Sequence, residues 1–273
     1  MNNKRKKYLA FPYVLWMAAF IIIPLFMIIY YGLTNRNRQF TFENLTIIAE
    51  PSNLKALWLS LKLSTLSTIL CLILAYPLAS ILTKIKMKNK SILVFIFILP
   101  MWMNFLLRTL AWQTLLDKNG VINTVLTFFH LPLINIINTP GAIILGMVYN
   151  FLPFMILPIY NTLSKIDSSV VDAARDLGAN EFQTFLRITF PLSLPGVISG
   201  ITMVFVPALT TFVISDILGG SKILLIGNVI EQEFKYANNW HTGSGLSLVL
   251  MVFILISMAL VSKYDKESEG NIW

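Results

Sequence analysis

Charged side chains gather in one short stretch of this chain, residues 172–191, which reads DAARDLGANEFQTFLRITFP. The charges in it belong to two aspartates, a glutamate and two arginines: Asp172, Arg175, Asp176, Glu181 and Arg187. Residues 119–164 before this stretch and residues 188–215 at its end contain no Asp, Glu, Lys or Arg. Catalysis would need a nucleophile with a base, or a metal site. A charged island between long apolar segments instead suits contact with a soluble partner.

A second set of polar side chains lies within the apolar segments, at their ends or in the loop beyond them. Ionisable groups inside a membrane are costly, which makes them candidates for contact with a solute. Asp216 could instead pair with Arg108, and the neutral members could serve only in hydrogen bonding between helices. Glu233 lies two residues from Glu231 in the same loop and could also meet a solute or a soluble partner. The candidates for solute contact are Asp216, Tyr149, Asn150, Asn104 and Glu231.

The sequence offers no constellation for catalysis or metal binding. Its single cysteine, Cys71, lies in the middle of an apolar segment, and its two histidines, His130 and His241, lie in loops. The stretch from Gly219 to Lys222 does not have the order of a phosphate-binding G-x-x-x-x-G-K-[ST] loop. We therefore expect no enzyme activity, no cofactor and no metal in this chain.

Composition indicates a membrane protein. Of the 273 residues, 56% are hydrophobic and 12% are charged, and the mean hydropathy is +0.72. A soluble domain has about twice that charged fraction. A transmembrane helix needs about 20 mostly apolar residues, and continuous apolar segments favour helices over a barrel. The expected fold is all-α and polytopic, one membrane domain over residues 1–273 with six spans at about 10–32, 57–83, 91–112, 139–163, 192–216 and 243–262.

The distribution of basic residues predicts how the spans are oriented. The N-terminus, the loop near residue 87, the loop at 164–191 and the C-terminal tail together hold 13 of the 21 Lys and Arg residues, and the opposite loops hold six. The positive-inside rule then places both termini and the 164–191 loop in the cytoplasm. Because the basic clusters flank spans and form no groove, the net charge of +8 does not indicate nucleic-acid binding.

Local signals predict a short helix at the start of the charged island. Ser169 and Asp172 have the spacing of a capping box, in which each side chain bonds the backbone N–H of the other residue. Ala173 and Ala174 then leave a smooth face that another protein could approach closely. Gly178 can take the left-handed conformation that ends a helix.

A second helix is expected to follow directly. Asn180 can cap it, with Gln183 three residues further on. This helix is expected to run from Glu181 to Phe190, and Pro191 marks the entry to the fifth span. The island is therefore predicted to be a pair of helices along the membrane surface.

The spacing within the island resembles the EAA loop of permease subunits of bacterial ABC importers. The pattern of that loop is E-A-A, three residues, G, nine residues, I, one residue, L-P. Here Asp172 begins D-A-A, and Gly178, Ile188 and Pro191 follow at the matching spacings, with Asp for Glu and Phe for Leu as the departures. In that family the first helix docks on the ATPase. The resemblance thus implies coupling to an ATPase through Asp172, Ala173, Ala174, Arg175, Asp176, Leu177 and Gly178.

Other segments are similar to permeases of the spermidine/putrescine group. They are residues 107–112 (LRTLAW), 146–160 and 214–230. Asn239-Trp240 followed by Gly243 resembles the D-W-P-x-G segment of that group, although His241 and Thr242 stand where proline is expected. The resemblance covers nearly the whole chain and implies a polyamine as the solute.

The resemblance also implies an assembly in the bacterial plasma membrane. It predicts a type I ABC importer permease fold, two cytoplasmic ATPases that bind ATP and Mg, a second permease subunit in a heterodimer, and an extracytoplasmic polyamine-binding protein. This chain, in contact with lipid, would form half of the translocation pathway and work by alternating access. The candidates for solute contact would line that pathway.

Two other classes of transporter remain open. One is an ABC permease for another small cation or ion, because related permeases carry other organic cations, iron or sulfate. The other is a secondary transporter or a channel, which needs no ATPase. Co-purification of an ATPase with this chain separates the second class from the first.

Overall fold

The computed structural model describes residues 11–85, 92, 95–97 and 99–270. Within these ranges it consists of helices joined by turns and loops. The described residues form no strand, only an isolated bridge between Thr34 and Phe40. Five helical segments in them are long and apolar enough to cross a membrane: Phe11–Gly32, Pro51–Lys84, Pro140–Leu163, Glu181–Thr210 and Trp240–Ala259. These helices confirm the predicted all-α class, and they overlap five of the six predicted spans.

The chain divides into two compact units. The first unit comprises Met1–Lys55 and Val229–Leu255, and the second comprises Ala56–Asn228 and Ile256–Trp273. Three helices contain the division points: α4 (Pro51–Lys84), α13 (Ile226–Lys235) and α14 (Trp240–Gly270). Each unit is described by itself below.

The first unit contains the first span and a polar turn that is fixed by a buried asparagine. A π-helical turn, η1 (Ala18–Ile22), leads into α2 (Ile23–Gly32), and α3 (Glu43–Thr46) and η2 (Ile47–Ala49) follow. Asn44 donates from Nδ2 to the carbonyls of Gly32 and Thr34, at 3.2 and 2.9 Å. These bonds satisfy carbonyls that the end of α2 leaves without a helical partner.

The second unit is built on two packed helices, α8 (Pro140–Leu163) and α11 (Phe190–Thr210). Small residues let them approach closely. A Cβ at Gly196 would lie 2.7 Å from the carbonyl oxygen of Pro158, and one at Gly200 would lie 2.7 Å from Met155 Sδ. Small residues at helix interfaces are a common device in membrane proteins, since dispersion contacts drive the packing of helices there.

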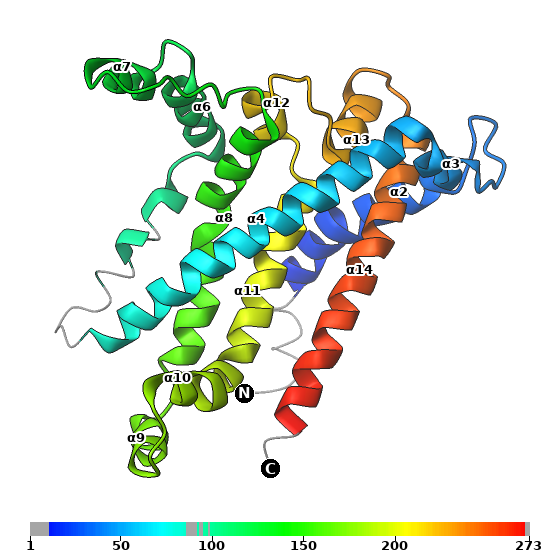
Figure 1. Ribbon diagram of the computed structural model, residues 1–273. Helices are drawn as coiled ribbons and strands as arrows, with labels where there is room; N and C mark the ends of the chain where they lie inside the picture. Colours follow the sequence, from blue (N-terminus) through cyan, green and yellow to red (C-terminus); the bar gives the residue numbers. More distant parts are fainter. Residues whose placement is uncertain (1–10, 86–91, 93–94, 98, 271–273) are drawn as a thin grey trace. The chain divides into compact units, whose positions relative to one another are not determined.

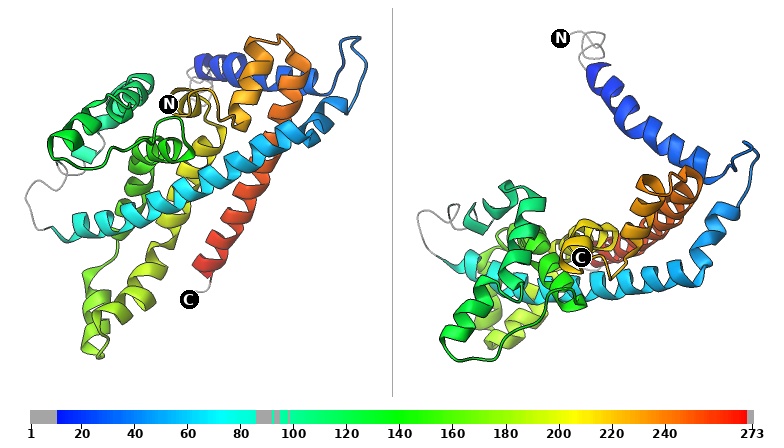
Figure 2. Two further views of the ribbon diagram at one scale, coloured as in Figure 1. Left: turned by 45° about the horizontal axis from the view of Figure 1, so that its top comes forward. Right: turned by 90° about the horizontal axis from the view of Figure 1, so that it is seen from above.

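Shorter helices occupy the two ends of this pair. At one end are α6 (Phe105–Leu116), α7 (Val121–Phe128) and α12 (Val213–Leu218); at the other are α9 (Ser168–Asp176), α10 (Glu181–Thr184) and the π-helical turn η4 (Phe185–Thr189) (Figure 1). The left view of Figure 2 shows the same arrangement, with the yellow-green turn near residue 175 at the far end from α12. The charged island therefore lies at one end of the α8–α11 pair.

The third predicted span, 91–112, is not one continuous helix where the structure describes it. Residues 86–91, 93–94 and 98 lie outside the described residues. The short 3-10 helix η3 (Leu99–Trp102) precedes a break, and α6 then begins anew at Phe105. Asn104 leaves the helical conformation and caps α6, with Oδ1 accepting from the N–H groups of Leu106 and Leu107. The interruption sits where the sequence places Pro100 and a capping residue in an apolar run.

Candidate functional site

The first helix of the charged island is α9, and it starts two residues earlier than the sequence predicts. Its N-cap is Asp167, whose Oδ1 accepts from the N–H of Ser169 at 2.9 Å. That bond lowers the pKa of the Asp167 carboxyl, because the backbone donor favours the charged form. The predicted capping box between Ser169 and Asp172 is therefore wrong. Asp167, Ser168 and Ser169 all have side chains that can cap a helix, which made the local signal ambiguous.

The end of α9 is the turn that the sequence predicts. Gly178 has a φ of +84°, in the left-handed region. Its N–H donates to the carbonyl of Arg175 at 2.9 Å, and the N–H of Ala179 donates to that of Ala174 at 3.1 Å. This pair of bonds is the Schellman motif, which satisfies the last carbonyls of the helix. A Cβ at Gly178 would meet nothing within 4 Å, so glycine is required here for its backbone conformation and the space above it is open.

The second helix of the island starts as predicted but does not stop at Phe190. Asn180 and Gln183 form a reciprocal capping box, with bonds of 2.8 and 3.0 Å. From Glu181 the helix continues through α10, η4 and α11 to Thr210. Pro191 does not interrupt it, because proline is tolerated in the first turn of a helical stretch and η4 absorbs one extra residue just before it. The island is thus joined to the fifth span by an unbroken helix.

The surface of the island combines exposed apolar side chains with a small charge network. Leu177 is 90% exposed and Phe182 is 70% exposed. Arg175 reaches Asp172 at 3.9 Å within α9 and Glu181 at 3.6 Å on α10. Exposed apolar side chains of this size beside charges are typical of a surface that meets another protein. The seven residues assigned to coupling lie together on this segment.

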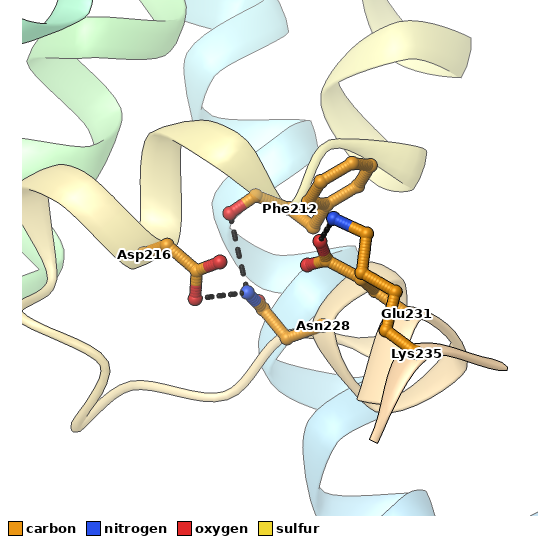
Figure 3. A network of polar contacts seen from close by, with 5 residues as sticks. All are labelled: Phe212, Asp216, Asn228, Glu231 and Lys235. Atoms are coloured by element: carbon orange, nitrogen blue, oxygen red, sulfur yellow. Dashed lines mark hydrogen bonds and ion pairs between the residues drawn. The ribbon is translucent and has the colours of Figure 1, made fainter. Parts of the chain in front are cut away.

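Asp216 lies at the opposite end of the helix pair and has a partner that the sequence did not indicate. Asn228 donates from Nδ2 to Asp216 Oδ1 at 2.7 Å and to the carbonyl of Phe212 at 3.1 Å (Figure 3). The Oδ1 atom of Asn228 accepts from Ser215 Oγ at 2.6 Å and from the N–H of Leu225 at 3.0 Å. Asn228 is 1% exposed. A buried amide with four bonds is rigid, so it holds the Asp216 carboxylate in one place.

The start of α13, which carries Asn228, is anchored to α4, and the end of α12 is anchored to the turn just before α8. Ser60 Oγ accepts from the N–H of Ile226 at 2.8 Å, across 166 positions of sequence. The N–H of Asn138 donates to the carbonyl of Leu218 at 2.8 Å. The sequence gives no local signal for either contact, since the partners lie far apart in the chain. Asn228 is therefore a site residue that sequence reasoning missed.

The candidates on α6 and α8 include polar atoms that find no partner within the described part of the chain. Arg108 is 7% exposed, yet its Nε and Nη1 have no hydrogen-bond acceptor there. Asn150 donates from Nδ2 to the carbonyl of Gly146 at 2.9 Å, while its buried Oδ1 accepts no hydrogen bond from the described residues. The ring of Tyr149 lies edge-on to Trp112 with centroids 5.2 Å apart. Buried polar atoms without partners are costly and commonly mark functional positions.

The remaining candidates have other tasks. Asn104 is the exposed N-cap of α6, and its side-chain Oδ1 accepts hydrogen bonds from two backbone N–H groups. Glu231 forms an ion pair with Lys235 one turn further along α13 (Figure 3). The pKa of the neighbouring Glu233 is raised, first by burial and then by the charge of Glu50. The structure thus brings Arg108, Tyr149 and Asn150 to adjoining helices and gives Asp216 its own hydrogen-bonded support.

Comparison with known protein families agrees with this architecture. The family model for the "binding-protein-dependent transport system inner membrane component" matches residues 74–267. The spermidine/putrescine transport system permease protein PotB of Haemophilus influenzae is 38% identical, over 97% of this chain and 96% of its own. PotB of Escherichia coli is 38% identical over 87% and 89%. A PotB homolog of Mycoplasma genitalium is 31% identical over 88% and 82%.

Solved structures confirm the fold. A bacterial alginate ABC transporter in complex with its alginate-bound periplasmic protein aligns with a TM-score of 0.80 at 16% identity, over 95% of this chain and 93% of that chain. A bacterial ABC transporter involved in alginate import aligns with the same score and identity, over 98% of each chain. At this identity the likeness shows the fold alone, which is that of an ABC importer permease. The chain therefore belongs to the family of binding-protein-dependent transport system inner membrane components, and it is a multi-pass protein of the bacterial inner membrane.

Proposed function

We propose that this chain is a permease subunit of an ATP-driven importer for polyamines, of the spermidine and putrescine class. The observation that carries this proposal is the 38% identity to a spermidine/putrescine permease, which extends over 97% of the chain. Identity of that extent includes the spans that would form the pathway as well as the charged island. The chain would supply half of the pathway, and a second permease subunit would supply the other half.

Coupling to the ATPase is assigned to the α9–α10 segment. Leu177 and Phe182 are apolar, exposed and held on a rigid turn, which suits insertion into a cleft of a soluble partner. The open space above Gly178 allows close approach of that partner. Because the helix that begins at Glu181 continues into the fifth span, a push on the segment would act directly on α11. The coupling residues are those from Asp172 to Gly178, with Phe182 added by its exposure.

Contact with the cationic solute is assigned first to Asp216. Its carboxylate has the charge that complements an ammonium group, and Asn228 fixes its position. Tyr149 and Asn150 are secondary candidates, since the Tyr149 ring packs against Trp112 of α6 and the buried amide oxygen of Asn150 accepts no bond from the described residues. Asn104 and Glu231 are weaker candidates, because their oxygens already serve a helix cap and an ion pair. Weak binding suits a pathway, because the solute must also leave.

The complete machine in this proposal has four kinds of component. Two cytoplasmic ATPases bind ATP and Mg and dock on the coupling helices of two different permease chains. An extracytoplasmic polyamine-binding protein delivers the solute. Both termini and the α9–α10 segment face the cytoplasm, as the basic residues indicate. Closure of the ATPases would rock the permease halves between inward-open and outward-open states.

Transport by the reconstituted complex tests the proposal. Proteoliposomes that contain this chain with its partner subunits are expected to accumulate radiolabelled putrescine or spermidine when ATP and the binding protein are supplied. A complex with a hydrolysis-deficient ATPase is the matched control. ATP-driven transport of a different solute, with no polyamine uptake, would remove the polyamine assignment. Polyamine uptake without any ATPase would show a secondary transporter instead.

A further inference from the structure

The first unit contains a pocket that takes no part in the sites described above. It has a volume of about 490 Å³, within the range of about 300–1,000 Å³ that is usual for small-molecule sites. It lies where the end of the first span, the loop after it and the start of α14 meet within this unit. Its lining residues are Met27, Tyr31, Arg36, Asn238, Asn239, Trp240 and His241.

Aromatic rings from two segments line the pocket. The ring of Tyr31 lies 6.0 Å from that of Trp240 and 5.4 Å from that of His241, measured between centroids. Phe234 supports Trp240 from α13, with centroids 5.4 Å apart and the rings nearly perpendicular. Rings that hold one another in this way keep their orientation, so the pocket is built in advance of any ligand.

The polar atoms of the pocket are oriented by hydrogen bonds within the same unit. The indole N–H of Trp240 donates to Asn238 Oδ1 at 3.1 Å, and Asn238 takes a left-handed conformation with φ of +48°. His241 Nδ1 lies 3.1 Å from the carbonyl oxygen of Tyr31. A carbonyl only accepts, so Nδ1 carries the proton, and in the neutral ring Nε2 is then an acceptor. The indole donor of Trp240 is thus occupied, while His241 offers a lone pair.

We propose that this pocket binds the alkylammonium end of a polyamine. A cation over the faces of Trp240 and Tyr31 is stabilised by the ring quadrupoles, and Nε2 of His241 can accept a hydrogen bond from the ammonium group. Met27 gives an apolar contact for the methylene chain. The inference rests on the proposed function, because only a polyamine importer would meet such a solute, and it adds a binding site that is separate from Asp216.

Arg36 also lines the pocket, and its charge has the same sign as the ligand. Its side chain is exposed, so water and salt screen the repulsion. The repulsion keeps binding weak, as a transit site requires. Removal of the Arg36 charge should therefore strengthen the binding of a cation to this pocket and weaken the binding of an anion.

Fluorine NMR of the assembled complex, with this chain labelled with 5-fluorotryptophan, tests the site directly. The Trp240 signal is assigned as the one that the Trp240→Phe variant lacks. Titration with putrescine is expected to shift this signal saturably, whereas 1,4-butanediol, which has the same carbon chain without charge, leaves it in place. A Trp240 signal that does not respond to putrescine, or that responds equally to the diol, overturns the proposal.

Variants of two lining residues decide the chemistry. Tyr31→Leu should weaken the apparent affinity for putrescine about fivefold, the size of one cation–π contact, while Tyr31→Phe, which keeps the ring, should leave it unchanged. Arg36→Gln should strengthen it about threefold. Weaker binding in Arg36→Gln, or equal binding in Tyr31→Leu and wild type, overturns the proposal. Uptake by the wild-type complex is measured separately, so polyamine import without a response at Trp240 contradicts only this site.

Discussion

The α9–α10 segment and the Asp216–Asn228 site lie at opposite ends of the same pair of helices, and they are held in contrasting ways (Figure 1). The first is exposed, and the bonds that shape it join residues at most five positions apart. The second is centred on the buried Asn228, and three of the four bonds of that side chain join residues 12 to 16 positions apart, with a further anchor 166 positions away. A surface that docks a partner can be shaped locally. A carboxylate inside a bundle needs support from several helices.

The largest effect is expected from the loss of Asn228. Asn228→Leu keeps most of the volume but leaves the buried N–H of Leu225 without this acceptor and removes the bond to Asp216 Oδ1. A buried donor left unpaired costs about 1–3 kcal/mol, so the variant should unfold at a clearly lower temperature. Thermal unfolding of the detergent-solubilised complex measures this. Asn161→Leu, at an exposed position of α8, is the control and should change the Tm little. Equal Tm values in the two variants would show that the buried site is not rigidly held.

Asp216→Asn separates the chemistry of the buried site from its stability. The amide can still accept the bond from Asn228, so assembly of the complex should remain near wild type. Uptake at limiting polyamine should fall about tenfold, because a charge-assisted contact with a cation is worth about 1.5–3 kcal/mol. Uptake of radiolabelled putrescine by proteoliposomes measures this. Unchanged uptake would remove Asp216 from the pathway and leave the site a structural one.

The two regions also differ in how far the sequence predicts them. The turn at Gly178 and the capping box of Asn180 follow from residue types and spacing alone, since the partners are neighbours in the chain. The N-cap at Asp167 was missed because Ser169 offers a competing cap two residues later. Asn228 could not be found, because nothing near it in sequence indicates that it meets Asp216. The break at Asn104 shows the same limit, since hydropathy averages over one capping residue.

Gly178→Ala is expected to have an intermediate effect, confined to the exposed region. The left-handed conformation costs a residue with a Cβ about 1–2 kcal/mol, so the turn should fray while the Tm of the complex changes little. Association with the ATPase, measured by co-purification, should fall about tenfold. Gly178→Asn tolerates the backbone conformation and serves as the matched variant. If Asn preserves association and Ala does not, the glycine acts through the backbone. If both lose association, the partner occupies the open space above Gly178. Normal association of both variants would contradict the docking assignment.

Arg175→Gln is expected to have the smallest effect on stability, because the ion pairs of Arg175 lie on the exposed segment. Its ion pairs with Asp172 and Glu181 are 3.9 and 3.6 Å long and involve exposed side chains. Pairs of this kind contribute about 0–1 kcal/mol and weaken with salt, so the Tm of the complex should not change measurably. Co-purification of the ATPase should nevertheless weaken, and more strongly at low salt, if Arg175 meets a carboxylate of the partner. A loss of association without a loss of stability places Arg175 at the interface. A loss of stability without a loss of association would mean that this exposed segment, like the buried site, depends on its polar contacts for its fold.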